Sequence, residues 1–253
     1  MRVHVVQLSY GDDETLDARV ERVAAIVRAQ QGADLVVLPE LWPNGGFAYD
    51  GWEASAQPLD GPVVTALREA ARELGALVHM GSFVERDETG RMFNTSLLLG
   101  DDGSVLATYR KIHLFGFGEG EPKLMTPGDD VVVHEGLGLA TCYDLRFPEQ
   151  FRRLLDAGAE IVLLPAAWPA KRVAHWRLLA QARAIENQSY VVACNTAGKH
   201  SGVRMGGGSL VVDPWGAVLA EAGTDEEVLV ADLDLESLAR TRSSFPILAD
   251  RRL

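Results

Sequence analysis

Runs of apolar residues alternate along this chain with segments whose apolar residues recur at helical spacing. Residues 35–38 and 161–164 are apolar throughout, which is typical of buried strands, whereas residues 13–30 and 173–187 are amphipathic and predict helices. Gly100-Asp101-Asp102-Gly103 separates two strand-like runs and predicts a hairpin. Further strands are expected at 3–8, 77–84, 93–99, 105–109, 131–134, 137–141, 190–194, 209–212, 217–220 and 227–233, and further helices at 61–74 and 147–157.

Alternating helices and strands followed by hairpins, twice over, indicate an α/β protein whose sheets are not purely parallel. Two such sheets packed face to face, with helices outside, make a four-layer α-β-β-α sandwich with two mixed β-sheets. The 253 residues, 47% of them hydrophobic, suffice for a large core, and no stretch has the composition of a linker. We therefore expect a single domain over residues 1–253, with residues from about 240 to 253 as a C-terminal tail.

Charge and cysteine content narrow the class of protein. The formal net charge is -12 and no basic stripe is visible, which argues against nucleic acid and anionic membrane surfaces as partners. No window reaches the ~18 apolar residues of a membrane span, and the first residues lack the features of a signal peptide. Two cysteines do not suggest a secreted disulfide scaffold. A soluble, cytoplasmic protein is expected.

Three chemically active residues each follow a predicted strand. Cys142 comes after residues 137–141, at the kind of strand end where open α/β sheets place their chemistry. Glu40 follows Pro39 between apolar neighbours, which favours partial desolvation and a carboxylate suited to accept a proton. Lys111 follows Arg110 at another strand end, where an inward ammonium stabilises an anion. The structural alternatives are that Glu40 is a solvated loop residue and that Lys111 belongs to a basic turn.

Histidine is the commoner activator of a catalytic cysteine, so the six histidines are alternative candidates for the general base. His113 and His175 lie nearest to the candidate residues in sequence, and a structural hydrogen-bonding role is expected for both. Cys194 ends an apolar strand and is expected to be a core residue. The histidines are scattered and predict no metal site, and no cofactor is expected.

Segments 38–40 (LPE), 109–115 (YRKIHLF) and 141–149 (TCYDLRFPE) together resemble the nitrilase, or carbon-nitrogen hydrolase, superfamily. The resemblance implies that Glu40 is a general base, Lys111 stabilises a tetrahedral intermediate, and Cys142 is the nucleophile. A second glutamate is implied in the loop at 116–128, where Glu121 matches best and Glu119 is the alternative. The resemblance also implies a homodimer or a higher homo-oligomer.

The roles implied by the resemblance define a reaction. Cys142 passes its proton toward Glu40 and attacks a carbonyl carbon, with its thiolate sustained by Lys111. The oxyanion forms between Lys111 and a backbone N–H, that of Tyr143. Ammonia leaves, a thioester remains on Cys142, and water activated by Glu40 and positioned by Glu121 releases the acid.

Segments 165–176 (PAAWPAKRVAHW) and 182–188 (ARAIENQ) look like the amidase branch that includes ω-amidases and deaminated glutathione amidases. A carboxylate-bearing amide of that kind requires cations, and Arg172, Lys171 and Arg146 are candidates. Arg146 has a structural alternative, a pair with Asp144 or Glu149. The substrate-binding set expected is Tyr143, Arg146, Trp168 and Arg172.

The sequence is also compatible with other substrates and with one other class of protein. An N-carbamoyl amide hydrolase, or an aliphatic amide or nitrile hydrolase, would use the same Glu-Lys-Cys site. A catalytically inactive interaction scaffold would be expected to lack one of the three residues, and all three are present. The sequence leaves open which amide, carbamoyl or nitrile compound is the physiological substrate.

Overall fold

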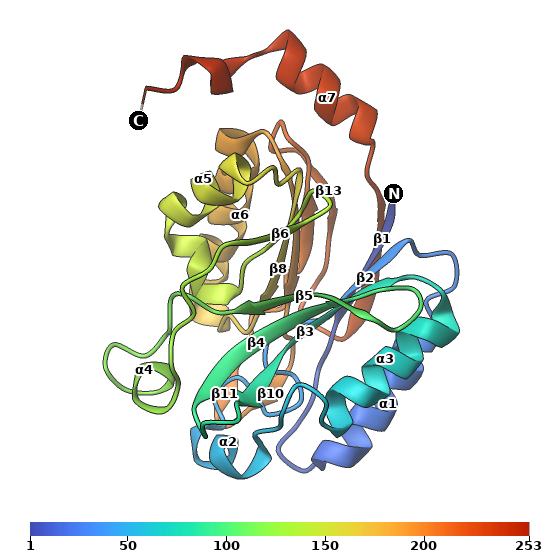
Figure 1. The fold of residues 1–253 in the computed structure, drawn as a ribbon, viewed down its shortest axis with the longest axis vertical. Helices are drawn as coiled ribbons and strands as arrows, with labels where there is room; N and C mark the ends of the chain where they lie inside the picture. The colour runs from blue at the N-terminus through green and yellow to red at the C-terminus, as the bar shows by residue number, and fades with distance from the viewer. Residues whose placement is uncertain (253) are drawn as a thin grey trace.

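The computed structural model describes residues 1–252 and contains two six-stranded mixed sheets packed face to face, with helices on their outer faces (Figure 1). The strand orders are β14-β1-β2-β3-β4-β5 and β13-β12-β9-β8-β7-β6. A separate two-stranded ribbon pairs β10 (Lys199–His200) with β11 (Val203–Arg204). The architecture confirms the four-layer α-β-β-α sandwich expected from the alternation of apolar patterns.

The first sheet combines a parallel centre with antiparallel flanks. Strands β1, β2 and β3 run parallel, β4 and β5 follow antiparallel, and β14 pairs antiparallel with β1. Two helices pack on its outer face (Figure 1). The bounds are β1 (Arg2–Gln7), β2 (Leu35–Val37), β3 (Leu77–Arg86), β4 (Met92–Leu99), β5 (Val105–Arg110), β14 (Glu227–Asp232), α1 (Leu16–Arg28) and α3 (Pro62–Leu74).

The second sheet has the same plan. Strands β7, β8 and β9 run parallel, and β6, β12 and β13 are antiparallel to their neighbours. Helices α5 and α6 cover its outer face (Figure 1). The bounds are β6 (Val132–His134), β7 (Leu137–Leu139), β8 (Ile161–Ala166), β9 (Tyr190–Asn195), β12 (Leu210–Val212), β13 (Val218–Glu221), α5 (Pro148–Asp156) and α6 (Val173–Asn187).

The central core lies between the sheets. Val5, Val37 and Leu98 of the first sheet share one buried cluster with Leu163 and Val192 of the second. Face-to-face packing brings the carboxyl ends of β2 and β8 together. The backbone nitrogen of Glu40, after β2, lies 3.4 Å from the carbonyl oxygen of Ala166 at the end of β8. The sandwich therefore places strand ends from both sheets at one location, which is where the candidate residues lie.

Several short elements differ from the sequence expectation. The loop expected at 116–128 contains α4 (Glu121–Leu124), and the segment after Glu40 contains α2 (Tyr49–Ser55). The chain after Cys142 forms a 3₁₀ helix, η1 (Cys142–Arg146), before α5. A second 3₁₀ turn, η2 (Ala170–Arg172), precedes α6.

The expected C-terminal tail begins inside a helix. Helix α7 (Leu235–Ser244) crosses position 240, and η3 (Ile247–Asp250) follows it. Phe245 stacks on Trp215, and Arg251 pairs with Asp156, so the segment rests on the second half of the molecule (Figure 1). None of the helices in residues 1–252 has the length and apolar character needed to cross a membrane.

Candidate active site

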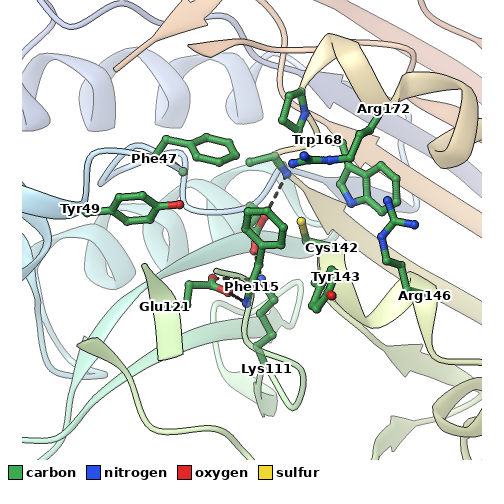
Figure 2. Close-up of a pocket in the computed structure, with 14 residues that line it drawn as sticks. Phe47, Tyr49, Lys111, Phe115, Glu121, Cys142, Tyr143, Arg146, Trp168 and Arg172 are labelled. Atoms are coloured by element: carbon green, nitrogen blue, oxygen red, sulfur yellow. Dashed lines mark hydrogen bonds and ion pairs between the residues drawn. The ribbon is translucent and has the colours of Figure 1, made fainter. Parts of the chain in front are cut away.

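Four predicted residues converge on one pocket (Figure 2). Glu40 follows β2, Lys111 follows β5, Glu121 opens α4, and Cys142 opens η1 after β7. The space in this pocket, including its open mouth, is about 400 Å³. Its lining also includes the aromatic side chains Phe47, Tyr49, Phe115, Tyr143 and Trp168, and the cations Arg146 and Arg172.

A buried charge cluster forms the floor of this pocket. Lys111 Nζ lies 2.7 Å from Glu40 Oε1, and 3.0 and 2.8 Å from Glu121 Oε1 and Oε2. All three side chains are at most 4% exposed. Two backbone N–H groups complete the cluster: that of Ala167 donates to Glu40 Oε2 at 2.9 Å, and that of Phe115 donates to Glu121 Oε2 at 2.6 Å. Of the two candidate glutamates, Glu121 lies in this cluster, whereas Glu119 is exposed and pairs with Lys123.

Burial and charge act in opposite directions on this cluster. Burial disfavours the charge of Lys111, but Glu121 and Glu40 outweigh it, so the pKa of Lys111 lies well above its usual range. Burial raises the pKa of Glu121, and repulsion by Glu40 adds to the effect while Lys111 opposes it. An ammonium that keeps its proton is therefore shared between two carboxylates away from water.

The backbone presents Cys142 in an unusual conformation. Its φ of +51° lies in the left-handed region, which a residue with a side chain adopts only when the surroundings hold it there. A capping box does so: the Thr141 and Asp144 side chains each accept a hydrogen bond from the other's backbone N–H. Asp144 also accepts from the Tyr109 hydroxyl at 2.6 Å.

The surroundings of Cys142 favour its neutral thiol form in the resting site. Burial raises its pKa well above the usual range, and the charge of Glu40 adds to this, while Lys111 opposes it. Lys111 lowers the pKa of Cys142, as a cation that sustains a thiolate should, but burial and Glu40 outweigh it in the resting site. Glu40 is the adjacent group able to take the proton.

The two histidines near the site in sequence lie beside it rather than in it. His113 stacks on Phe147 with ring centroids 3.8 Å apart and places Nδ1 2.8 Å from Asp144 Oδ1. His175 Nδ1 lies 3.4 Å from the Arg146 guanidinium. Neither lines the pocket, which agrees with a structural role. Cys194 is fully buried on β9, as expected of a core residue.

Arg146 and Arg172 lie on the Trp168 side of the pocket (Figure 2). The Arg146 guanidinium sits over the Trp168 ring at 4.6 Å, and that of Arg172 sits over the Phe115 ring at 5.0 Å. Within residues 1–252, neither makes a salt bridge.

The predicted alternative for Arg146, a structural pair with Asp144 or Glu149, is therefore wrong. Asp144 is occupied instead by Tyr109, His113 and the Thr141 N–H. Lys171, the third cation considered, is exposed and does not line the pocket.

Comparisons with known proteins agree with this geometry. The family model described as carbon-nitrogen hydrolase matches residues 2–243. The chain belongs to the carbon-nitrogen hydrolase family. A 2-oxoglutaramate amidase of Paenarthrobacter nicotinovorans is 46% identical over 261 residues, covering 99% of this chain and 89% of that protein. Omega-amidase NIT2 of Mus musculus is 38% identical, covering 91% of this chain and 88% of the relative.

Among solved structures, Nit3 of Saccharomyces cerevisiae, described as a member of branch 10 of the nitrilase superfamily, superposes with a TM-score of 0.90 at 32% identity. The alignment covers 100% of this chain and 97% of that structure. An amidase from Nesterenkonia has also been solved after Michael addition of acrylamide at its active-site cysteine, and it is 28% identical with a TM-score of 0.83, over 97% of this chain and 98% of that one.

In this carbon-nitrogen hydrolase, three site residues carry no sequence signal strong enough to predict them. Phe47 and Tyr49 line the pocket from a segment with no regular apolar pattern. Burial raises the pKa of Tyr49 to about 12, with Glu121 and Glu40 adding to the effect, so its hydroxyl stays a neutral donor. Asn94 joins the charge cluster from β4, where it reads as an ordinary strand residue. Residues 1–252 contain no group of three or more His, Cys, Asp or Glu arranged to hold a metal ion.

Proposed function

We propose that this carbon-nitrogen hydrolase is an ω-amidase, which hydrolyses a small carboxylate-bearing amide such as 2-oxoglutaramate to the acid and ammonia. The observation that carries the proposal is a pair of arginines that have no carboxylate partner among residues 1–252, at a pocket whose floor holds Glu40, Lys111 and Cys142. A relative that is 46% identical over 99% of this chain bears the name 2-oxoglutaramate amidase, which supports the substrate class.

The first half of the reaction acylates the enzyme. The Cys142 proton moves to Glu40 as Sγ attacks the amide carbonyl carbon, which forms the S–C bond and places a negative charge on the carbonyl oxygen. Lys111 Nζ lies within 3.0 Å of three carboxylate oxygens, one of Glu40 and two of Glu121, in the resting site. Protonation of Glu40 weakens its bond to Lys111, so one N–H is released to the oxyanion, together with the Tyr143 N–H. Proton transfer and oxyanion stabilisation are thereby coupled.

The second half releases the product. The oxyanion collapses, the C–N bond breaks, and the nitrogen takes the proton from Glu40 to leave as ammonia. Water then attacks the Cys142 thioester and gives a proton to Glu40. Collapse of this second intermediate breaks the S–C bond, and the proton returns from Glu40 to the sulfur as the acid departs. Every proton moves through Glu40, and the thiol is restored.

Arg146 and Arg172 bind the substrate carboxylate on the Trp168 side of the pocket (Figure 2). Both are anchored by an aromatic ring rather than by an acidic side chain, so their N–H groups remain available to an anion. Tyr143 and Trp168 line the same pocket. This arrangement selects an anionic acyl group within an acidic protein.

An ammonia-release screen tests the proposal. The compounds are 2-oxoglutaramate, deaminated glutathione, glutamine, N-carbamoyl amino acids, aliphatic amides and nitriles, and the highest kcat/KM is expected for 2-oxoglutaramate. Arg172→Leu and Arg146→Leu should each raise KM by about 10- to 100-fold for the anionic substrates, the value of a lost charge-assisted hydrogen bond. Lys171→Leu is the matched control and should change KM little. Reaction of the N-carbamoyl compounds alone would overturn the ω-amidase assignment.

We also propose that the protein is a single domain that works in the cytoplasm as a homodimer. Cys142 and Cys194 are free thiols, which suits a reducing compartment. Leu178 and Ile185 are 66% and 48% exposed on α6, which supports self-association through an apolar face. Light scattering coupled to gel filtration should give twice the mass of the chain, and a monomer at micromolar concentration would contradict the dimer. Cell fractionation checks the compartment.

A further inference from the structure

Asn94 belongs to the charge cluster without lining the pocket. It lies on β4, is 1% exposed, and is absent from the set of residues that contact the substrate space. Its Nδ2 lies 2.9 Å from Glu40 Oε1 and 2.7 Å from Glu121 Oε1. One side-chain amide therefore donates to both carboxylates of the site.

The acceptor sites of Glu121 are all occupied. A carboxylate oxygen accepts about two hydrogen bonds. Oε1 of Glu121 accepts from Asn94 and Lys111, and Oε2 accepts from Lys111 and the Phe115 N–H. Glu121 therefore takes no proton or water without breaking an existing contact, and its role is to hold Lys111. The expectation that Glu121 positions the attacking water is not supported by this hydrogen bonding.

Whereas the acceptor sites of Glu121 are all occupied, Glu40 keeps one hydrogen-bond acceptor site unoccupied within residues 1–252. Its Oε1 accepts from Lys111 and Asn94 and is full, whereas Oε2 accepts only from the Ala167 N–H. The Ala167 N–H holds Oε2, and Glu40, Ala167 and Cys142 all line the same pocket, which Asn94 does not. The acceptor site that remains on Glu40 within residues 1–252 is therefore on the oxygen bound to Ala167.

We propose that Asn94 is a positioning residue that fills Glu40 Oε1 and thereby directs the Cys142 proton to Glu40 Oε2. The same amide bridges Glu40 to Glu121 and fixes the angle between the two carboxylates. This inference rests on the proposed acyl transfer through Cys142, and it adds the atom at which the proton moves and the residue that selects that atom.

The orientation of the Asn94 amide supports this role. Its Oδ1 is buried and has no hydrogen-bond partner within residues 1–252, which carries a free-energy cost. Rotating the amide by 180° would turn Oδ1 toward two carboxylate oxygens, which are acceptors only. The donor orientation is therefore imposed by the two glutamates, and the fold tolerates an unsatisfied oxygen to maintain it.

Two variants and one control test the proposal. Asn94→Leu keeps the branched shape at Cγ and removes both donors, and Asn94→Ser keeps a single O–H donor that reaches only one carboxylate. For Asn94→Leu, kcat for 2-oxoglutaramate should fall about 10²-fold at neutral pH with KM within about twofold, as expected for a misplaced reacting group outside the substrate space. Asn94→Ser should retain an intermediate kcat. The control, Thr95→Val on the same strand, removes a hydrogen bond to Glu85 on the opposite face and should leave kcat unchanged.

The pH dependence separates positioning from a merely structural effect. Glu40, Glu121, Lys111, Cys142 and Tyr49 are the titratable groups that face the cluster. Loss of the Asn94 donors makes the ionised carboxylates less stable, so the acid limb of kcat/KM should move to higher pH in Asn94→Leu but not in Thr95→Val. An unchanged kcat and an unchanged acid limb in a folded Asn94→Leu variant would overturn the proposal.

A substrate-independent measurement keeps this test distinct from that of the proposed function. The rate of Cys142 alkylation by iodoacetamide against pH should show the same upward displacement of the acid limb in Asn94→Leu, relative to the wild type. If the wild type releases no ammonia from 2-oxoglutaramate, the substrate assignment fails while the alkylation profile still decides the role of Asn94. An alkylation profile identical to that of the wild type would contradict that role.

Discussion

Individual residues of the site hold states that their side chains would not adopt alone. Cys142 has a positive φ, Lys111 keeps a proton in a buried position, and Glu121 is desolvated beside a second carboxylate. Sequence position predicted which residues meet, because Glu40, Lys111 and Cys142 each follow a strand. It did not predict the protonation of Cys142, since that depends on how completely Glu40 and Glu121 neutralise Lys111.

Removal of the Lys111 charge tests its role at this scale. Lys111→Met keeps much of the side-chain volume but removes the one cation of the described residues, 1–252, that contacts both glutamates, so kcat should fall by at least about 10²-fold. Ammonia release measures the effect. Lys123→Met is the control, because Lys123 pairs with Glu119 on the surface and should tolerate the change. A Lys111→Met variant with a tenth of the wild-type kcat would contradict the oxyanion role.

The pH profile should be level on the alkaline side. Lys111 stays protonated through about pH 9, because its pKa lies well above that of an exposed lysine at about 10.4, and Cys142 loses its proton only during attack. On acidification, activity should fall as Glu121 takes a proton, above the range of an exposed glutamate because burial raises its pKa. A decline in kcat/KM between pH 7 and pH 9 would contradict these protonation states.

At the scale of elements, the strands bring the site residues together. The turns that follow the strands fix the exact positions of their side chains. Most strands are predictable, because buried apolar runs have few alternatives to a sheet. Helices α2 and α4 are not, since tertiary contacts hold them: the Trp52 indole N–H donates to the Gly45 carbonyl, and Glu121 is anchored by Lys111. No apolar pattern marks them in the sequence.

Strand β3 is irregular between His79 and Ser82, where its pairing with β4 shifts register, and Gly81 there lies against the Pro39 carbonyl group that precedes Glu40. Gly81 has a φ of +71°, and a Cβ there would lie 2.0 Å from the Pro39 carbonyl oxygen. Gly81→Ala should therefore push the Pro39–Glu40 peptide aside and lower both kcat and the free energy of unfolding. Gly90→Ala is the matched control, because Gly90 has a φ of +86° and open space around it. Denaturant unfolding should show Gly81→Ala to be about 1–3 kcal/mol less stable than Gly90→Ala, and equal stabilities would show that no close approach constrains Glu40.

At the scale of the whole molecule, the two sheets depend on each other. The last strand, β14, pairs with β1 and completes the first sheet. Because β14 follows the strands of the second sheet along the chain, the first sheet contains segments from both ends of the sequence. The sequence predicted two mixed sheets and layers of helices, because the alternation of elements is local. It did not predict the pairing of β1 with β14, which joins residues 2–7 to residues 227–232 and is set by packing between the sheets.

Because each sheet packs against the other, we expect the protein to unfold in one cooperative transition, as a single domain does. Leu163 lies in the cluster between the sheets and is fully buried. Leu163→Ala should lower the free energy of unfolding by about 2–5 kcal/mol while keeping a single transition. Fluorescence and circular dichroism during the same denaturant titration measure this. Two separated transitions, or a shift seen by one probe alone, would indicate that the halves fold independently.

The central claim is that Cys142 carries the acyl group during amide hydrolysis. Ammonia release from 2-oxoglutaramate by Cys142→Ala, compared with the wild type at equal concentrations of folded protein, tests it most directly. The wild type should release ammonia steadily, and Cys142→Ala should release none above the uncatalysed rate while unfolding at nearly the same denaturant concentration. Continued turnover by a folded Cys142→Ala variant would contradict the thioester mechanism.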